Sequence, residues 1–224
     1  MDKKVQQTIQ AALTAFNRVT SHPITDFTGK IEEVFDGGGQ FVDKVEAMDK
    51  LFDDEPRLES LREVFFDLLM INFFSEDVSK LEEDYLDSEE WEAIEEDTID
   101  RGTELLNLML YIKECEDEKI KPQLSDFLQE FLLVDDDEFQ DEHRIYEDII
   151  SNQILLETSY EDISQTAQRL DESSEIRDVF YPVMSFFFEP DPSMDQFDEY
   201  VQYSPEKEYD AAVYAILTTY NKPV

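Results

Sequence analysis

The sequence predicts an all-α protein, a compact multi-helix domain that spans residues 1–224. Three observations support this fold class. Apolar residues recur at intervals of three and four in almost every segment, which is the spacing of one helix face. No segment shows the strict alternation of apolar and polar residues that marks a half-buried strand. Hydrophobic residues make up 41% and aromatic residues 12% of the chain, so it can form a core despite a net charge of −39.

In the first third of the chain, proline and glycine separate the predicted helices. His22-Pro23 ends the first helix, because a residue before proline avoids the helical conformation. Gly37-Gly38-Gly39 is a flexible break, and Pro56 suits the first turn of the following helix. The segment 65–74 is apolar on nearly all sides, so we expect it to be central. The predicted inward faces are Val5, Ile9, Ala12, Leu13 and Phe16; the segment 30–35; Phe41, Val45, Met48 and Phe52; and Leu58, Leu61, Phe65, Leu68 and Leu69.

The remainder of the chain continues the helical period. Four acids at 135–138 are expected to stop a helix, because negative charge at a helix C-terminus opposes the helix dipole. Ser173 or Ser174 suits an N-cap, Pro182 should kink or split its helix, and 204–206 (Ser-Pro-Glu) begins the last helix. The predicted inward faces are Leu81, Tyr85, Trp91, Ile94 and Ile99; the segment 105–112; Leu124, Phe127, Leu128, Phe131 and Leu132; Tyr146, Ile149, Ile150 and Ile154; Tyr160, Ile163, Ala167 and Leu170; Ile176, Val179, Phe180, Val183 and Phe187; and Tyr209, Ala212, Val213, Ile216, Leu217 and Tyr220.

Two segments resemble each other within the chain. Residues 61–66 (LREVFF) match residues 176–181 (IRDVFY) position by position. Two interpretations stay open: degenerate helical-hairpin repeats, or the general likeness of two buried helices with acidic outer faces. A further, fainter match near residue 124 gives unequal separations, which is irregular for a solenoid.

Charge is distributed unevenly over the predicted domain. Residues 1–50 hold six basic and eight acidic side chains, a net charge of −2, which leaves −37 for residues 51–224. A subdivision near residues 37–40 is therefore an alternative to one domain of 224 residues. Such a charge excess repels itself in the folded state. Solubility needs only a net charge of about 2–8 for a small domain, so we expect the excess to serve a function.

The composition points to the cytoplasm. Cys115 is the single cysteine, so no internal disulfide can form and a reducing compartment is expected. The first residues lack the apolar core of a signal peptide, and no apolar run approaches the roughly 20 residues that span a bilayer. We expect a cytoplasmic protein that does not bind membranes.

No motif indicates a catalytic, cofactor or metal site, and we expect the protein not to be an enzyme. Gly37-Gly38-Gly39 lacks the Lys-Ser/Thr ending of a P-loop, and the two histidines lie far apart without the spacing of metal ligands. A calcium loop that began at Asp135 would place Gln140 and Tyr146 where an EF-hand needs glycine and glutamate.

The acidic stretch is the strongest functional signal. Between Asp54 and Glu104 the chain has nineteen acidic and four basic residues. On a helix, Glu89, Glu92 and Glu96 would form a ladder with neighbouring Cβ atoms about 5–6 Å apart. DNA phosphates recur about every 3.4 Å along the axis of each strand, so a rigid ladder of carboxylates can stand in for them. The predicted partner-binding residues are Glu82, Glu83, Asp87, Glu89, Glu90, Trp91, Glu92, Glu96, Asp135, Asp136, Asp137 and Glu138.

We therefore expect an acidic interaction protein that binds and blocks a basic partner, a nucleic-acid-binding protein or a toxin. It would act as a DNA-mimic-like inhibitor, an immunity protein or an antitoxin, without binding nucleic acid directly. Trp91, Tyr85 and Tyr200 are candidate anchors, because interface hot spots favour Trp and Tyr. Core packing is the alternative role of each. The sequence does not determine the oligomeric state.

Three other interpretations stay open. The acids can form a solvated face, as in proteins adapted to high salt. A helical-repeat adaptor would bind its partner through a groove, and that binding would survive high ionic strength. An enzyme with clustered carboxylates would use Mg²⁺ or Mn²⁺ and would show a large, saturable rise in melting temperature with the metal.

Overall fold

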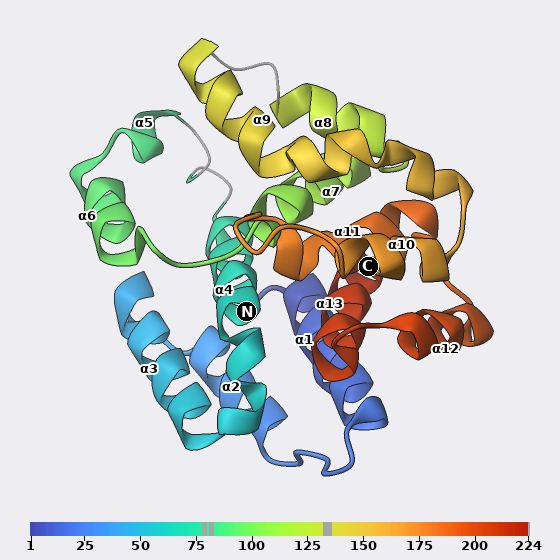
Figure 1. Cartoon of the computed structure of the whole chain (residues 1–224). Helices are drawn as coiled ribbons and strands as arrows, with labels where there is room; N and C mark the ends of the chain where they lie inside the picture. Colours follow the sequence, from blue (N-terminus) through green and yellow to red (C-terminus); the bar gives the residue numbers. More distant parts are fainter. Residues whose placement is uncertain (78–79, 81–82, 132–135, 224) are drawn as a thin grey trace.

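The computed structural model describes residues 1–77, 80, 83–131 and 136–223. Within these ranges the chain forms α-helices and 3₁₀ helices (η) and no β-strand, which confirms the predicted all-α class. The elements are α1 (Lys3–Val19), α2 (Phe27–Asp36), α3 (Phe41–Asp54), η1 (Pro56–Leu61), α4 (Arg62–Glu76), α5 (Glu83–Leu86), α6 (Glu89–Thr98), α7 (Leu105–Glu118), α8 (Leu124–Phe131), α9 (Asp136–Ser151), η3 (Gln153–Glu157), α10 (Tyr160–Ala167), α11 (Arg177–Phe188), α12 (Met194–Tyr203) and α13 (Lys207–Tyr220) (Figure 1).

The first and last long helices lie side by side at the centre of the molecule. α1 and α13 pack along one another (Figure 1). Ala15, Ala211 and Ala215 form a small buried cluster, and side chains of this size let two helices approach closely. α11 and α12 cover further faces of α13, so α13 is buried from Tyr209 to Tyr220 on nearly every side.

The N-terminal helices form one end of the molecule. α2 packs on α3, α3 on α4, and α4 on α7, so α4 is buried along most of its length, as its apolar sequence predicts. Phe27, Phe52 and Phe65 meet edge to face with ring centroids 5.1–6.3 Å apart. Gly37-Gly38-Gly39 is the turn between α2 and α3. Gly39 has φ +126°, a backbone conformation that residues other than glycine rarely adopt.

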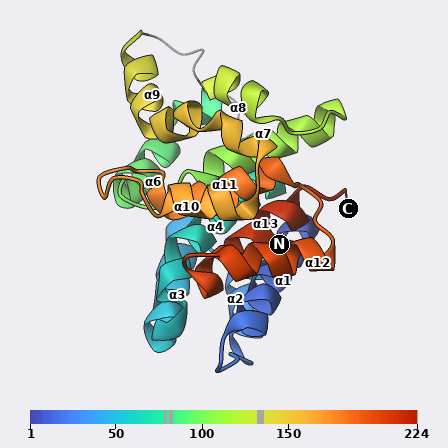
Figure 2. The ribbon, with the colours of Figure 1, turned by 45° about the vertical axis from the view of Figure 1, so that its right-hand side comes forward.

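The helices α7 to α11 lie at the other end of the molecule from α2 and α3, whereas α12 and α13 lie beside α1 (Figure 2). Figure 2 shows α7, α8 and α9 at one end, α10 and α11 below them, and α1, α2 and α3 at the other end. One cluster of buried apolar residues extends from Val5 to Tyr220 and joins these levels. Among the described helices, none has both the length and the apolarity needed to cross a bilayer.

The predicted cap of α11 is wrong, and the predicted split at Pro182 does not occur. α11 runs unbroken through Pro182, because its packing against α10 and α13 compensates for the hydrogen bond that proline cannot make. Neither Ser173 nor Ser174 caps it, because the helix begins only at Arg177; their hydroxyls donate to Asp171 and Asp148 instead. Ile176 holds the N-cap position without a side-chain bond.

Other local predictions also change. Residues 56–61 form the 3₁₀ helix η1 in front of α4 rather than its first turns. The acids 136–138 form the first turn of α9. Negative charge is favourable there, because the helix dipole is positive at the N-terminus. Ile99 and Ile154 are 81% and 66% exposed, not buried. The two segments of the internal match lie at the starts of α4 and α11. Both interpretations of the match, a repeat and a general likeness of buried helices, therefore stay predictions. Four residues with a predicted role lie outside the described ranges: Leu81, Glu82, Leu132 and Asp135.

Candidate functional site

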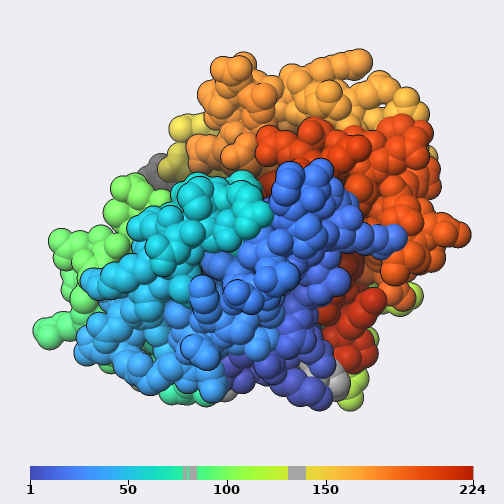
Figure 3. Space-filling model, turned by 90° about the horizontal axis from the view of Figure 1, so that it is seen from below, coloured from blue at the N-terminus to red at the C-terminus, as the bar shows by residue number. Residues whose placement is uncertain are grey.

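The acidic stretch folds into two short helices at the edge of the molecule. Residues 83–100 contain ten acidic and no basic residues, and they form α5, α6 and the turn after α6. In Figure 3 this green segment lies at the margin, beside the N-terminal helices in blue and cyan. The predicted ladder, Glu89, Glu92 and Glu96, lies on α6, and each of the three side chains is exposed.

The surroundings of the ladder are also acidic. Asp87, Glu90, Glu95, Asp97 and Asp100 are exposed as well. None of the acids from Asp87 to Asp100 forms an ion pair with any residue that the structure describes. Within those same residues, no group of His, Cys, Asp and Glu side chains is arranged to hold a metal ion. The surface therefore offers unneutralised carboxylates to a partner.

One face of α6 holds it against the body of the protein. Ser88 caps the helix, its hydroxyl accepting a hydrogen bond from the backbone N–H of Trp91 at 3.2 Å. The half-buried indole of Trp91 lies 5.4 Å from the ring of Phe74 on α4. Ile94 is buried one turn later. Trp91 therefore makes core contacts, the alternative role considered for it, while the acids of the opposite face point to solvent.

The anchor role predicted for Tyr200 is wrong. Its side chain is fully buried in α12, where the hydroxyl donates to the backbone carbonyl of Asp210 at 2.9 Å. The ring stacks on Tyr181 and Tyr214 with centroids 4.7 and 4.1 Å apart. A partner cannot reach it. Tyr85, the third candidate, is half-buried and lies 6.2 Å from Trp91 between ring centroids.

The other predicted acids lie on separate helices. Glu83 belongs to α5, and residues 136–138 form the first turn of α9. Neither group is part of α6. Glu82 and Asp135 lie outside the described residues. The structure thus places five of the predicted acids, Asp87, Glu89, Glu90, Glu92 and Glu96, on one exposed segment together with Trp91.

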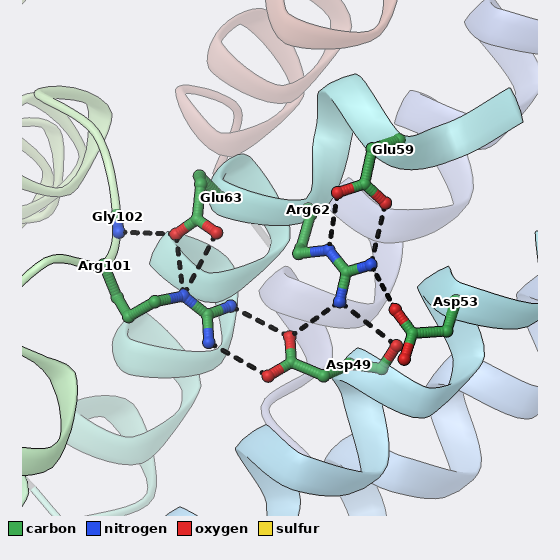
Figure 4. A network of polar contacts seen from close by, with 7 residues as sticks. All are labelled: Asp49, Asp53, Glu59, Arg62, Glu63, Arg101 and Gly102. Atoms are coloured by element: carbon green, nitrogen blue, oxygen red, sulfur yellow. Dashed lines mark hydrogen bonds and ion pairs between the residues drawn. The ribbon is translucent and has the colours of Figure 1, made fainter. Parts of the chain in front are cut away.

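Arg101, three residues after the end of α6, fixes the end of this segment. Arg101 donates two hydrogen bonds of 3.0 Å to the carboxylate of Asp49 on α3 and a third, of 2.9 Å, to Glu63 on α4 (Figure 4). Burial opposes the charge of Arg101, but these bonds outweigh it and raise the pKa of the guanidinium. The pairing is planar and two-pronged, which holds position as well as charge.

The same network takes up a second cation. Arg62 donates to Glu59, Asp53 and Asp49, so Asp49 bridges the two arginines (Figure 4). Hydrogen bonding, first of all to Glu59, raises the pKa of Arg62 above its usual range. Both arginines are thereby engaged below α6 and do not neutralise its outer face.

The two residues after Arg101 complete the attachment. Gly102 donates its N–H to Glu63 at 2.8 Å and has φ +93°. A Cβ atom there would lie 2.7 Å from a carboxylate oxygen of Asp67, so only glycine fits. Thr103 donates its N–H and its hydroxyl to the fully buried Asp67, and burial raises the pKa of this aspartate well above its usual range.

Sequence reasoning found the acids but missed this attachment. Arg101 and Asp49 are 52 residues apart, and nothing in either segment pairs them. The available signal was the Arg-Gly pair that ends a run of ten acids without a basic residue.

Comparisons with known proteins add no relative. No protein-family model, no curated protein and no solved structure matches this chain. A functional proposal for this chain therefore rests on its own charge distribution, packing and cavities.

Proposed function

We propose that this protein is an acidic inhibitor that binds and blocks a basic, nucleic-acid-binding surface of another protein through the exposed face of α6. The observation that carries the proposal is the unpaired ladder of carboxylates on a helix whose opposite face is packed on the core. In this proposal the protein works in the cytoplasm, is not an enzyme, and acts as a DNA mimic, an immunity protein or an antitoxin.

The geometry suits a phosphate mimic because spacing and rigidity come together. Carboxylates three and four residues apart on a helix are separated by about 5–6 Å at Cβ. The Ser88 cap, the Trp91 and Ile94 contacts and the Arg101 bonds all restrict α6, so little freedom is lost when a partner binds. The negative field of the whole chain would also speed the encounter with a basic surface, an effect that salt reduces.

The experiment compares two triple variants of equal charge. The test variant is Glu89→Lys, Glu92→Lys and Glu96→Lys on α6. The control is Glu33→Lys, Glu157→Lys and Glu199→Lys, three exposed acids on α2, η3 and α12. Each protein is immobilised, exposed to cell lysate at low salt and eluted with rising salt, and retained proteins are identified by mass spectrometry. The captured protein is then assayed for nucleic-acid binding with and without soluble wild type.

The expected result is a basic protein that wild type and control retain and the α6 variant loses, with slower association as the main cause. Wild type should also displace nucleic acid from it. Equal loss in both variants would show that total charge, and no particular surface, drives association. Equal retention in both would remove the proposal.

A groove on another face favours the alternative of an adaptor. Between α1, α12 and α13 lies a cavity of about 360 Å³, floored by Ala11, Ala15 and Ala215 and edged by Met194, which is 64% exposed. A partner bound in this groove would resist elution by salt, and the charge reversals on α6 would leave it bound.

A further inference from the structure

A second acidic feature lies away from the outer face of α6. The turn after Arg101, the start of α11 and the start of α13 enclose a cavity of about 350 Å³. Its walls include Thr103, Glu175, Asp178, Glu206 and Tyr209. A neighbouring cavity of about 440 Å³ shares Glu206 and Tyr209 with it, so the two spaces meet at these side chains.

Three carboxylates of this cavity are not neutralised. Glu175, Asp178 and Glu206 are exposed, and none of them pairs with a cation of the described chain. Of the nearby arginines, Arg57 lines the neighbouring cavity and is paired with Glu55 at 2.7 Å. Arg177 lines an adjoining cavity together with Asp178 and Glu206, but it forms no ion pair with either of them within the described ranges. A fourth carboxylate of the lining, that of Glu63, is paired with Arg101, so Glu175, Asp178 and Glu206 are the lining acids without an ion-paired counter-charge.

Tyr209 supplies an independent indication of a ligand. Its side chain is only 8% exposed, yet its hydroxyl makes no hydrogen bond to any residue within the described ranges. Tyr209 lines both cavities and its hydroxyl is not sealed from solvent, so water can occupy the place that a ligand would take. Burial, together with the charges of Asp178 and Asp210, raises the pKa of Tyr209 well above its usual range, so the hydroxyl keeps its proton. The hydroxyl of a tyrosine as buried as this one usually has a protein partner, and within the described ranges this hydroxyl has none.

We propose that this cavity binds the guanidinium group of an arginine carried on a basic protein partner. A planar guanidinium presents five N–H donors in fixed directions and can therefore contact several carboxylates and a phenol oxygen at once. A cavity of 350 Å³ lies within the size range of small-ligand sites, about 300–1,000 Å³. The site shares with the proposed function only the basic character of the partner, because α6 contributes no residue to it.

The test measures binding of a fluorescent hexa-arginine peptide to the full-length protein by anisotropy, at about 25 and 150 mM NaCl. Tyr209→Phe removes only the hydroxyl, and Asp178→Asn with Glu206→Gln removes two charges. A charge-matched control is Glu33→Gln with Glu157→Gln. A second comparison is Glu89→Gln, Glu92→Gln and Glu96→Gln on α6. Spermidine and a hexa-lysine peptide compete as alternative organic cations.

The expected result is a loss of affinity of about tenfold in the double cavity variant and a smaller loss in Tyr209→Phe, from the missing charge-assisted hydrogen bonds. Tyr209→Phe should melt like wild type, since the hydroxyl makes no internal bond. The control should bind the peptide as wild type does, and the lysine peptide should compete more weakly than the arginine peptide.

Two outcomes would overturn the inference without touching the proposed function. In the first, the α6 variant loses the peptide while both cavity variants retain it. In the second, the control loses as much as the cavity variants, which would indicate net charge alone. Spermidine that competes as well as the arginine peptide would overturn the assignment to a protein side chain. Peptide binding that fails in the cavity variants and persists in the α6 variant supports the site, whatever α6 itself binds.

Discussion

Asp210 makes the stability of this protein depend on pH. It lies in α13, where its side chain accepts hydrogen bonds from the hydroxyl of Ser204 at 2.5 Å and from the backbone N–H of Glu206 at 3.0 Å. Burial is the dominant influence: with 3% of the residue exposed, it raises the pKa of Asp210 from 3.8 to about 7, although both hydrogen bonds favour the ionised form.

The size of the effect follows from the shift. Between pH 4 and 7 the folded protein holds this proton while the unfolded chain has released it, so stability falls as the pH rises. A shift from 3.8 to about 7, at about 1.4 kcal/mol per pKa unit, amounts to about 4 kcal/mol. This contribution is fully present below the ordinary pKa and lost above about pH 7.

Asp210→Asn removes the titration and keeps an oxygen that can accept both hydrogen bonds. Urea unfolding of wild type and variant, measured from pH 4 to 8, should show the variant gaining about 4 kcal/mol relative to wild type across this range. The exposed Asp191→Asn serves as the control and should show no such trend. A difference between Asp210→Asn and wild type that stays constant with pH would refute the reasoning, because the aspartate would then be ionised in the folded protein throughout.

Three further outcomes test the attachment of α6 and the charge of the chain. Arg101→Ala should cost about 1.5–3 kcal/mol and red-shift the emission of Trp91, the single tryptophan, because the half-buried Glu63 loses its cation, Asp49 keeps only Arg62, and α6 loosens; unchanged emission would contradict this role. Gly102→Ala should cost about 1–3 kcal/mol in urea unfolding from the φ of +93° and the contact with Asp67. Gly29→Ala, where an added Cβ meets nothing within 4 Å, should cost nothing, and equal effects would argue against strain at Gly102. The melting temperature should rise between about 10 and 500 mM NaCl as screening weakens self-repulsion; no rise would mean that the acids are compensated internally.

The helices were largely predictable from sequence because the apolar period records which face is buried. Val5, Ile9 and Phe16 in α1, and Ile216 and Leu217 in α13, follow that spacing and are buried. Boundary signals were weaker. Ser174 resembles an N-cap but bonds to Asp148, which lies 26 residues earlier, and Pro182 is held in a continuous helix by the packing around it.

The sequence by itself determined the fold class, the excess of charge and the exposed ladder Glu89, Glu92 and Glu96, since these depend on composition and on neighbours three or four residues away. It could not distinguish an accessible tyrosine from a buried one, and Tyr200 was misjudged for that reason. Only the tertiary structure decided that Arg101 binds Asp49 and that Tyr209 lines an acidic cavity. Both arise where segments far apart in the chain meet, and such contacts leave no periodic trace in either segment.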